Sequence, residues 1–214
     1  MSTVIDLSQA YYEGMPHATT IPAPSFRPVR TMEEHGLRCL ELRMPIHLGT
    51  HLDAPSHFIA DGATIDQVPP STLIGPAVCV SVDKPADQPI EIADLEAADA
   101  RPGDALLIRT GWDELFTDPG YLHHPYLSVP AAEWIVRRGF RLVGVDTVTP
   151  ELPGDLRPTG YPCPVHTTLL GAGVLILENL VLREVTNTRF TLVVGALKIV
   201  GGDGSPARVL ALPV

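Results

Sequence analysis

The chain has 214 residues, of which 45% are hydrophobic and 19% charged, and its formal net charge is −10 at pH 7. This composition predicts a folded protein with a substantial core and argues against intrinsic disorder. The negative charge, with no basic patch in the sequence, argues against a nucleic-acid partner, because phosphate binding needs a basic surface.

Cysteine usage and apolar runs bear on the cellular compartment. The three cysteines are scattered and form no C-x-x-C pair, which is typical of reduced thiols and predicts a cytoplasmic protein. The N-terminus shows no basic region, so no signal peptide is expected. No apolar run reaches the ~18–20 residues that a membrane span needs. We therefore expect one domain over residues 1–214, with neither a membrane nor a nucleic-acid partner.

The first half of the chain is predicted to contain strands and loops. Residues 11–30 are rich in proline and aromatic residues and are expected to form an extended loop. Residues 37–46 alternate between apolar and other side chains, which is the period of a strand, and they run directly into a histidine-rich stretch. Further strands are expected at 4–7 and 78–82.

The second half combines strands with helices. A short helix is expected over 92–100, and a longer one over 129–138, where Ser128 would cap the first turn and Gly139 would end the helix. Because strands dominate, the predicted fold class is mixed α/β, strand-rich with a few helices. The strands are expected at 105–108, 142–145, 174–177, 190–200 and 207–212.

The most informative segment is residues 47–57, HLGTHLDAPSH, in which three histidines and one aspartate all occupy odd positions. On a helix, Asp53 would turn away from the face shared by His47 and His51, and the glycine and proline oppose a helix. On a strand, with its side-chain period of two, all four side chains project to one side. A fully extended strand would separate His47 from His51 by ~13 Å, so a bend at Gly49 is expected.

This segment indicates an open metal site. Histidine and aspartate are ligands for Zn²⁺, Mn²⁺ and Fe²⁺. The simpler alternative, ordinary polar residues on a strand, would suit one histidine better than four ligand-type side chains in a segment without Lys, Arg or Glu. A purely structural zinc site is usually closed and rich in thiolates, and the cysteines lie far away in sequence.

Other residues are candidates for completing the site. Glu178 follows an apolar run, where a buried carboxylate is costly unless it is paired or coordinating, and a salt bridge to Arg183 is a fair alternative. His166 enters a predicted short helix and is either a ligand or a partly exposed histidine. Asp146 ends another apolar strand and could support the ligands. The histidine pair at 123–124 is expected to be exposed.

At these residues the chain resembles a known family. The pattern H-x-G-T-H-x-D-x-P-x-H-F, from His47 to Phe58, is similar to the signature of the metal-dependent cyclase/arylformamidase family, which includes bacterial kynurenine formamidases and isatin hydrolases. The resemblance covers nearly the whole chain, because four further segments resemble family blocks in the same order. These segments are residues 110–113, 143–146, 177–180 and 197–206.

The resemblance implies a swivelling β/β/α-type fold, a homo-oligomer (dimer or tetramer) and a divalent metal cofactor, zinc or manganese. His57 matches the residue that transfers protons in the family. Isatin hydrolases hold one Mn²⁺ with three ligands, whereas two further positions complete the site of two-zinc formamidases. This chain keeps every position, so one or two ions per subunit are both open. The matching metal ligands are His47, His51 and Asp53, completed by His166 and Glu178.

The expected function is metal-dependent hydrolysis of an amide, formamide or lactam C–N bond in a small molecule. A bound divalent ion lowers the pKa of its water from about 15.7 to roughly 7, and His57 would act as general base and then as general acid. The formamidases carry a tryptophan after the Met-Pro near the N-terminus, where this chain has His17, and this departure argues against N-formylkynurenine as substrate. Candidate substrate contacts are His17, Phe26 and Phe58.

Two other functions remain open at this point. A metal-dependent cyclase or dehydratase of natural-product metabolism would use the same Lewis acid and the same base to close a ring or remove water. A non-enzymatic protein that binds a metal or a small molecule is the second alternative. The presence of His57 argues against a pure binding protein, which has no need of a base at that position.

Two substitutions separate metal binding from proton transfer. We expect His57→Ala to lower turnover by ~10²–10⁴-fold, the usual contribution of a general acid–base group, while the protein keeps its metal. Asp53→Ala should lose metal and activity together. Elemental analysis beside steady-state kinetics checks both, and a wild-type protein that is active without metal would contradict both expectations.

Overall fold

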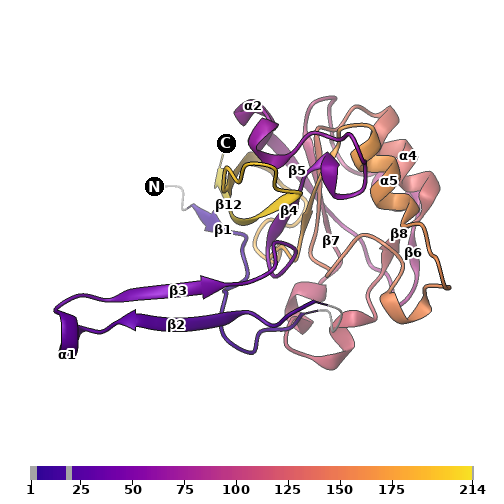
Figure 1. The fold of residues 1–214 in the computed structure, drawn as a ribbon. Coiled ribbons are helices and arrows are strands. Elements are labelled where there is room, and N and C mark those ends of the chain that lie inside the picture. Colours follow the sequence, from indigo (N-terminus) through magenta and orange to yellow (C-terminus); the bar gives the residue numbers. More distant parts are fainter. Residues whose placement is uncertain (1–3, 18–20, 214) are drawn as a thin grey trace.

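The computed structural model describes residues 4–17 and 21–213, and its main element is an eight-stranded sheet (Figure 1). In chain order the strands are β1 (Ile5–Asp6), β4 (His51–Asp53), β5 (Ile74–Ser81), β7 (Ala105–Arg109), β9 (Leu142–Val145), β10 (Leu175–Glu178), β11 (Arg189–Ala196) and β12 (Gly204–Pro213). Their order in the sheet is β1-β12-β11-β5-β7-β9-β10-β4, and an additional pairing of β12 with β4 curls the sheet into a barrel.

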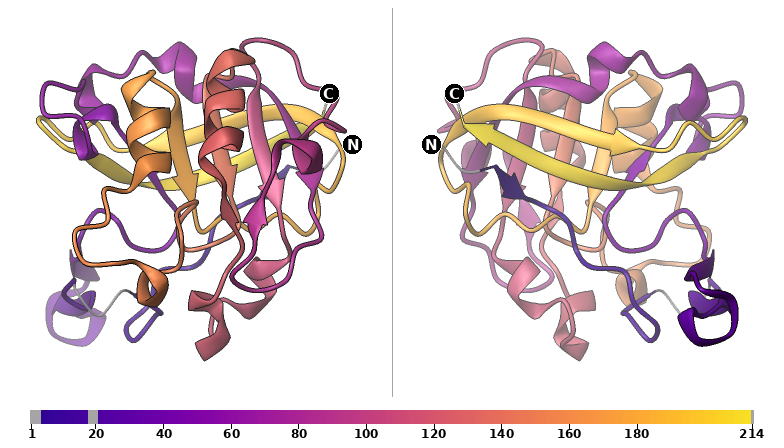
Figure 2. Two further views of the ribbon diagram at one scale, coloured as in Figure 1. Left: turned by 90° about the vertical axis from the view of Figure 1, so that its right-hand side faces the viewer. Right: turned by 90° about the vertical axis from the view of Figure 1, so that its left-hand side faces the viewer.

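The centre of this sheet is parallel and buried on both faces. β5, β7, β9 and β10 pair in parallel, and their sequences are apolar runs because neither face meets water. Two helices, α4 (Val129–Arg137) and α5 (Pro164–Gly171), cover one face, where they pack with one apolar cluster (Figure 2). A second apolar cluster fills the inside of the curled sheet.

The short strand β4 closes the barrel and is fully buried. It lies antiparallel to β10 on one side and antiparallel to β12 on the other. His51 is therefore opposite Glu178 in one ladder and opposite Pro206 in the other. This pairing holds residues that are distant in sequence at fixed positions beside one another.

A long hairpin projects from the body of the protein (Figure 1). It consists of β2 (Ser25–Arg30), the one-turn helix α1 (Met32–His35) and β3 (Cys39–Arg43), and residues 25–43 are called the arm below. The loop predicted over 11–30 is wrong for residues 25–30, because β3 supplies a pairing partner; its residues 18–20 lie outside the described residues. The side chain of Thr31 caps α1, and Gly36 ends it at φ +67°.

Most elements predicted in the second half of the chain are confirmed. The helix at 129–138 is α4, and Ser128 accepts a hydrogen bond from the Ala131 amide at its N-terminus. The helix predicted over 92–100 is shorter and forms only α3 (Ile92–Leu95). The remaining elements are α2 (Pro70–Leu73), the parallel pair β6 (Pro89–Ile90) and β8 (Tyr126–Leu127), and 3₁₀ turns at Pro55–His57, Ile65–Gln67, Trp112–Leu115, Pro119–Leu122 and Gly154–Leu156.

The strand-rich mixed α/β class predicted from the sequence is confirmed by this architecture. Within residues 4–17 and 21–213, no helix has the length and apolar character that crossing a bilayer requires.

One close contact in the centre of the sheet gives a test of the packing. A methyl group at Gly144 would lie 2.5 Å from Leu107 Cδ2 and 2.7 Å from Leu180 Cδ1. We expect Gly144→Ala to lower the free energy of unfolding by about 1–3 kcal/mol, as overpacking typically does. Gly154→Ala, where nothing lies within 4 Å of the added carbon, is the matched control. Urea denaturation measures both, and equal stabilities for the two variants would contradict the packing argument.

Candidate metal centre

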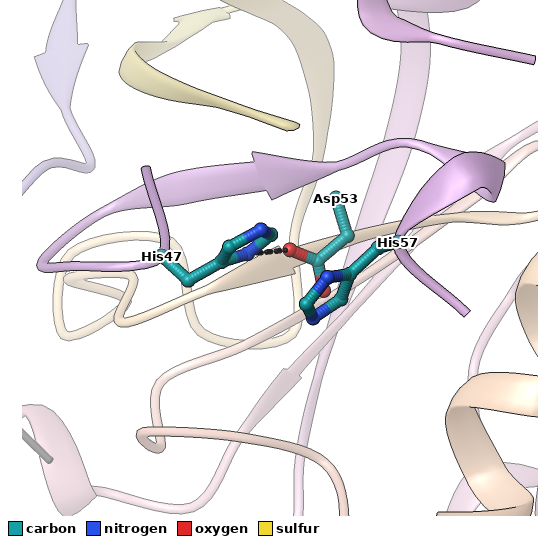
Figure 3. A group of neighbouring side chains, drawn as sticks. All are labelled: His47, Asp53 and His57. Atoms are coloured by element: carbon teal, nitrogen blue, oxygen red, sulfur yellow. Dashed lines mark hydrogen bonds and ion pairs between the residues drawn. The ribbon is translucent and has the colours of Figure 1, made fainter. Parts of the chain in front are cut away.

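The histidine-rich segment folds back on itself instead of running straight. Gly49 adopts φ +56°, which turns the chain before β4, and Pro55 begins a 3₁₀ turn directly after it. The predicted bend at Gly49 is confirmed, whereas the prediction of a strand up to residue 57 is wrong because the strand ends at Asp53. The two turns bring the imidazoles of His47 and His57 to the same carboxylate (Figure 3).

The Asp53 carboxylate is the centre of a cluster of ligand-type atoms. This side chain is 1% exposed. Its Oδ1 lies 2.8 Å from His47 Nδ1 and 3.3 Å from His51 Nε2, and its Oδ2 lies 3.5 Å from His166 Nε2. His57 stacks on His47, with 3.7 Å between the ring centroids. Three histidines therefore face one buried carboxylate, and a fourth lies against them.

The two candidates from distant segments join this cluster. Glu178 ends β10 beside β4, and its carboxylate oxygens lie 3.3 Å from His51 Nε2 and 3.2 Å from His166 Nε2. His166 lies on α5 and is buried, so the partly exposed alternative is excluded. Arg183, the other partner considered for Glu178, instead pairs with Asp113 at 3.1 Å.

The donor set suits a divalent ion. Ligand atoms of His47, Asp53 and His57 lie within 4.8 Å of one another, and so do those of His51, Asp53 and Glu178. Two of these atoms, His51 Nε2 and Asp53 Oδ2, are buried without a hydrogen-bond partner. An unsatisfied buried polar atom is costly, and an ion between nitrogen and carboxylate ligands would satisfy both. Asp53 belongs to both groups.

Without an ion, the cluster is held by charge pairing. Burial opposes the charged imidazole, but the adjacent carboxylates of Asp53 and Glu178, each 3.3 Å from its Nε2, outweigh burial and raise the pKa of His51 to about 10. The pKa of His166 is raised by the carboxylates of Asp53, Glu151 and Glu178, which likewise outweigh burial. Burial is likewise overcome at Glu178, where the two histidines lower the carboxyl pKa to about 2.

His57 differs from the other histidines of the cluster. It is only half-buried, and burial lowers its pKa, so the ring is neutral near pH 7 and able to accept a proton. Its Nδ1 lies 3.5 Å from Asp203 Oδ2, which also lies 3.0 Å from His47 Nε2. Phe58, 36% exposed, packs against the rings of His57 and His166 at 4.5 and 4.6 Å between centroids.

Sequence reasoning missed two carboxylates of the site. Glu151 is fully buried, accepts hydrogen bonds from the His166 amide and from the Tyr161 hydroxyl, and lies 3.3 Å from His166 Nδ1. It orients the ring in the way that carboxylates orient metal-bound histidines. Glu151 lies in an irregular segment and gives no periodic signal. Asp203 lies in the 197–206 block, whose likeness to the family was the one available signal.

Several other candidates lie elsewhere. His17 Nδ1 lies 3.1 Å from the Met15 carbonyl, and His17 lines a cavity of about 200 Å³ beside Tyr121, not the cluster. Phe26 lies on β2 of the projecting arm. Of the three predicted substrate contacts, only Phe58 is placed beside the cluster in this chain.

Two further expectations from the sequence are corrected. His124 is buried, not exposed: its Nδ1 bonds the Pro125 carbonyl, and burial lowers its pKa to about 4, which keeps the ring neutral. The Asp146 carboxylate accepts hydrogen bonds from the amides of Thr110 and Gly111, so it holds that turn instead of the candidate ligands.

The titration of the cluster gives a pH prediction for metal-free protein. The raised pKa of His51 contributes stability that is complete below about pH 6.5 and is lost toward about pH 10. The lowered pKa of Glu178 contributes stability that is complete above about pH 4.5 and is lost toward about pH 2. Thermal unfolding with chelator should therefore show the highest Tm between about pH 4.5 and 6.5.

Metal-loaded protein is the control for this pH dependence. An ion binds neutral imidazole, so loading should flatten the alkaline fall in Tm. The same alkaline slope with and without metal would contradict the assignment of the fall to this cluster.

Comparisons with known proteins identify the family of this chain. The family model described as Cyclase matches residues 5–152. The kynurenine formamidase of Geobacillus thermodenitrificans is 33% identical over 210 residues, 97% of this chain and 96% of the relative. A solved structure described as a potential metal-dependent hydrolase with cyclase activity is 31% identical, with a TM-score of 0.82 over 99% of this chain and 98% of its own. Isatin hydrolase A of Ralstonia solanacearum is 26% identical, with a TM-score of 0.86 over 99% and 92%. The family predicted from the sequence is confirmed, and the chain belongs to the Cyclase family.

Proposed function

We propose that this chain is a metal-dependent hydrolase that cleaves an amide, formamide or lactam C–N bond in a small molecule. The observation that carries the proposal is the buried Asp53 carboxylate, with three imidazoles and a second carboxylate around it and two ligand atoms left without partners. The kynurenine formamidase and the isatin hydrolase that resemble this chain agree with the class of reaction predicted from the sequence.

We assign the metal ligands from the resemblance to the family, and the cluster brings the matching residues together around Asp53. A first ion would be held by His47, His51 and Asp53, and a second by Asp53 with His166 and Glu178. Zinc and manganese both suit this donor set of imidazole and carboxylate, and one or two ions fit it. A bound ion would supply Lewis acidity, which polarises a carbonyl and makes water a nucleophile near neutral pH.

His57 is the proposed proton-transfer residue. Its neutral ring takes a proton from the attacking water and returns it to the departing nitrogen, so that the amine leaves uncharged. Asp203, 3.5 Å from its Nδ1, is placed to hold the ring in one orientation. Phe58 supplies an apolar wall beside His57, which suits an aromatic or other flat substrate.

A second candidate function is ring closure or dehydration. The description of the matching family as Cyclase favours this function. The same ligands and base would act on a substrate that carries its own nucleophile, which would then replace water. The products distinguish the two reactions, because hydrolysis adds one water to the substrate and the alternatives do not.

We further propose that the protein is one domain that works in the cytoplasm as a homo-oligomer, either a dimer or a tetramer. The three cysteines are free thiols in the structure, which suits a reducing compartment. Leu40 and Leu42 of the arm are exposed apolar side chains, and they support self-association.

The proposed hydrolysis is tested on protein stripped with chelator and then loaded with Zn²⁺ or Mn²⁺. N-formylkynurenine, N-formyl-arylamines and isatin are the substrates, and mass spectrometry identifies the products. We expect the rate on at least one substrate to fall about 100-fold or more without metal and to return with it. His123→Asn, which changes a half-exposed histidine outside the cluster, is the control and should keep the full rate. Equal rates in stripped and loaded protein would overturn the proposal.

A further inference from the structure

Two of the proposed ligands lie at an end of the β4–β10 ladder. His51 is opposite Glu178 in the last pair of this ladder. Gly49 turns one chain at φ +56°, and Asn179 turns the other at φ +56°, so both segments diverge directly beyond the pair. A left-handed conformation is uncommon outside glycine, and asparagine is among the residues that adopt it most readily. The end of a ladder is where strand pairing opens most easily, so this ligand pair needs a further restraint.

A side-chain hydrogen bond supplies a restraint at this end of the ladder. Thr50 Oγ1 donates to the Asn179 carbonyl at 2.6 Å. The register of the ladder places these two residues opposite each other, one step beyond His51 and Glu178. The hydroxyl therefore joins the two segments at the point where they no longer pair as strands.

Thr50 is itself firmly held. It is fully buried, and its carbonyl accepts hydrogen bonds from the Ala207 amide of β12 at 3.0 Å and from the Tyr11 hydroxyl. Its Oγ1 also accepts a hydrogen bond from the Gln9 amide at 2.7 Å. A hydroxyl has one proton to donate, and here that proton is directed at the Asn179 carbonyl.

Asn179 is held from the opposite side as well. Its amide donates to the Thr147 carbonyl at 2.9 Å. Its side-chain Oδ1 accepts a hydrogen bond from the Tyr121 hydroxyl at 2.8 Å, and both side chains are buried. Because a buried polar group that loses its partner is costly, these bonds fix the backbone at Asn179.

The position of Asn179 determines the position of the neighbouring Glu178. The carboxylate oxygens of Glu178 lie 3.3 Å from His51 Nε2 and 3.2 Å from His166 Nε2. Metal–ligand distances tolerate a variation of only about 0.2 Å. A small shift of the chain at Asn179 would therefore move the carboxylate enough to weaken the binding of an ion.

We propose that Thr50 and Asn179 are positioning residues of the metal centre. The hydrogen bond between them holds Glu178 in register with His51 and so sets the affinity for the ion that Glu178 binds. This inference rests on the metal ligands assigned under the proposed function, and it adds two residues that are not themselves proposed as ligands. They act on the ion through the backbone.

Zinc affinity tests the role of the Thr50 hydroxyl. Protein stripped of metal is titrated with Zn²⁺ in competition with a chromophoric chelator, and Glu178→Gln identifies the Glu178-dependent ion as the one whose Kd it weakens. Thr50→Val keeps the shape of the side chain but removes the hydroxyl, and it should weaken that Kd by about 10-fold, as for groups that support metal ligands. Thr50→Ser loses a methyl group but keeps the hydroxyl, and its Kd should stay within about 2-fold of wild type.

Ser205→Ala is the matched control. Ser205 is as fully buried as Thr50, and its hydroxyl likewise accepts a hydrogen bond from a backbone amide, that of Leu197, at 2.7 Å. It lies on β12, on the side of β4 away from β10, and should leave the Kd of the Glu178-dependent ion unchanged.

A double-mutant cycle separates positioning from a general loss of stability. If Thr50 acts through Glu178, Thr50→Val should have no further effect on zinc binding in a Glu178→Gln background, whereas a general structural effect would weaken binding by the same factor in both backgrounds. Circular dichroism and Tm report whether each variant is folded. Tyr121→Phe, which removes the hydroxyl bound to Asn179 and keeps the ring, is the second variant and should weaken the same Kd.

Three results would overturn the proposal: a Kd that Thr50→Val leaves unchanged, an equal loss in both backgrounds, or a Glu178→Gln variant that weakens no ion. These titrations contain no substrate. Protein that binds zinc as expected but hydrolyses none of the tested compounds would therefore overturn the proposed hydrolysis and leave the positioning role intact.

Discussion

The buried carboxylate of Asp53 is the constraint on which the site depends. A charge at 1% exposure is tolerated only where counter-charges or an ion compensate it, and the surrounding imidazoles supply that compensation in the metal-free protein. The same arrangement leaves His51 Nε2 and Asp53 Oδ2 without hydrogen-bond partners. The charges of the cluster are therefore balanced, but two of its buried polar atoms lack hydrogen-bond partners. A bound cation would supply a partner to both atoms.

The pairing of β4 in the sheet fixes the position of this carboxylate. β4 has only three residues, yet it is paired on both sides, so its backbone is as firmly held as that of a long central strand. One neighbour, β10, contributes Glu178 in register with His51. The helix α5 lies between β9 and β10 in the chain and places His166 3.2 Å from Glu178. The proposed ligands from three separate parts of the chain meet because the parallel α/β core positions Glu178 and His166, and the antiparallel strand β4 positions His51 and Asp53.

The sequence predicted the local chemistry better than the spatial arrangement. A short apolar run predicted β9 with the bounds that the structure shows, and the spacing of the histidine segment predicted the bend at Gly49. The arm was missed in its first strand because proline and aromatic content resembles a loop, and only pairing with β3 makes it a strand. Glu151 and the buried state of His124 could not be predicted, because they depend on contacts between segments that no local pattern encodes.

The cluster residues and the candidate substrate contacts lie on different kinds of structure, and this affects how the protein can evolve. Four of the proposed ligands, His51, Asp53, His166 and Glu178, lie on paired strands or on α5, whereas Phe58 and the segment around His17 lie in loops. Loops accept substitutions and insertions far more readily than paired strands. Substitutions in the loops can therefore change the preferred substrate while the metal cluster stays intact. Related chains can in this way catalyse the same reaction on different small molecules.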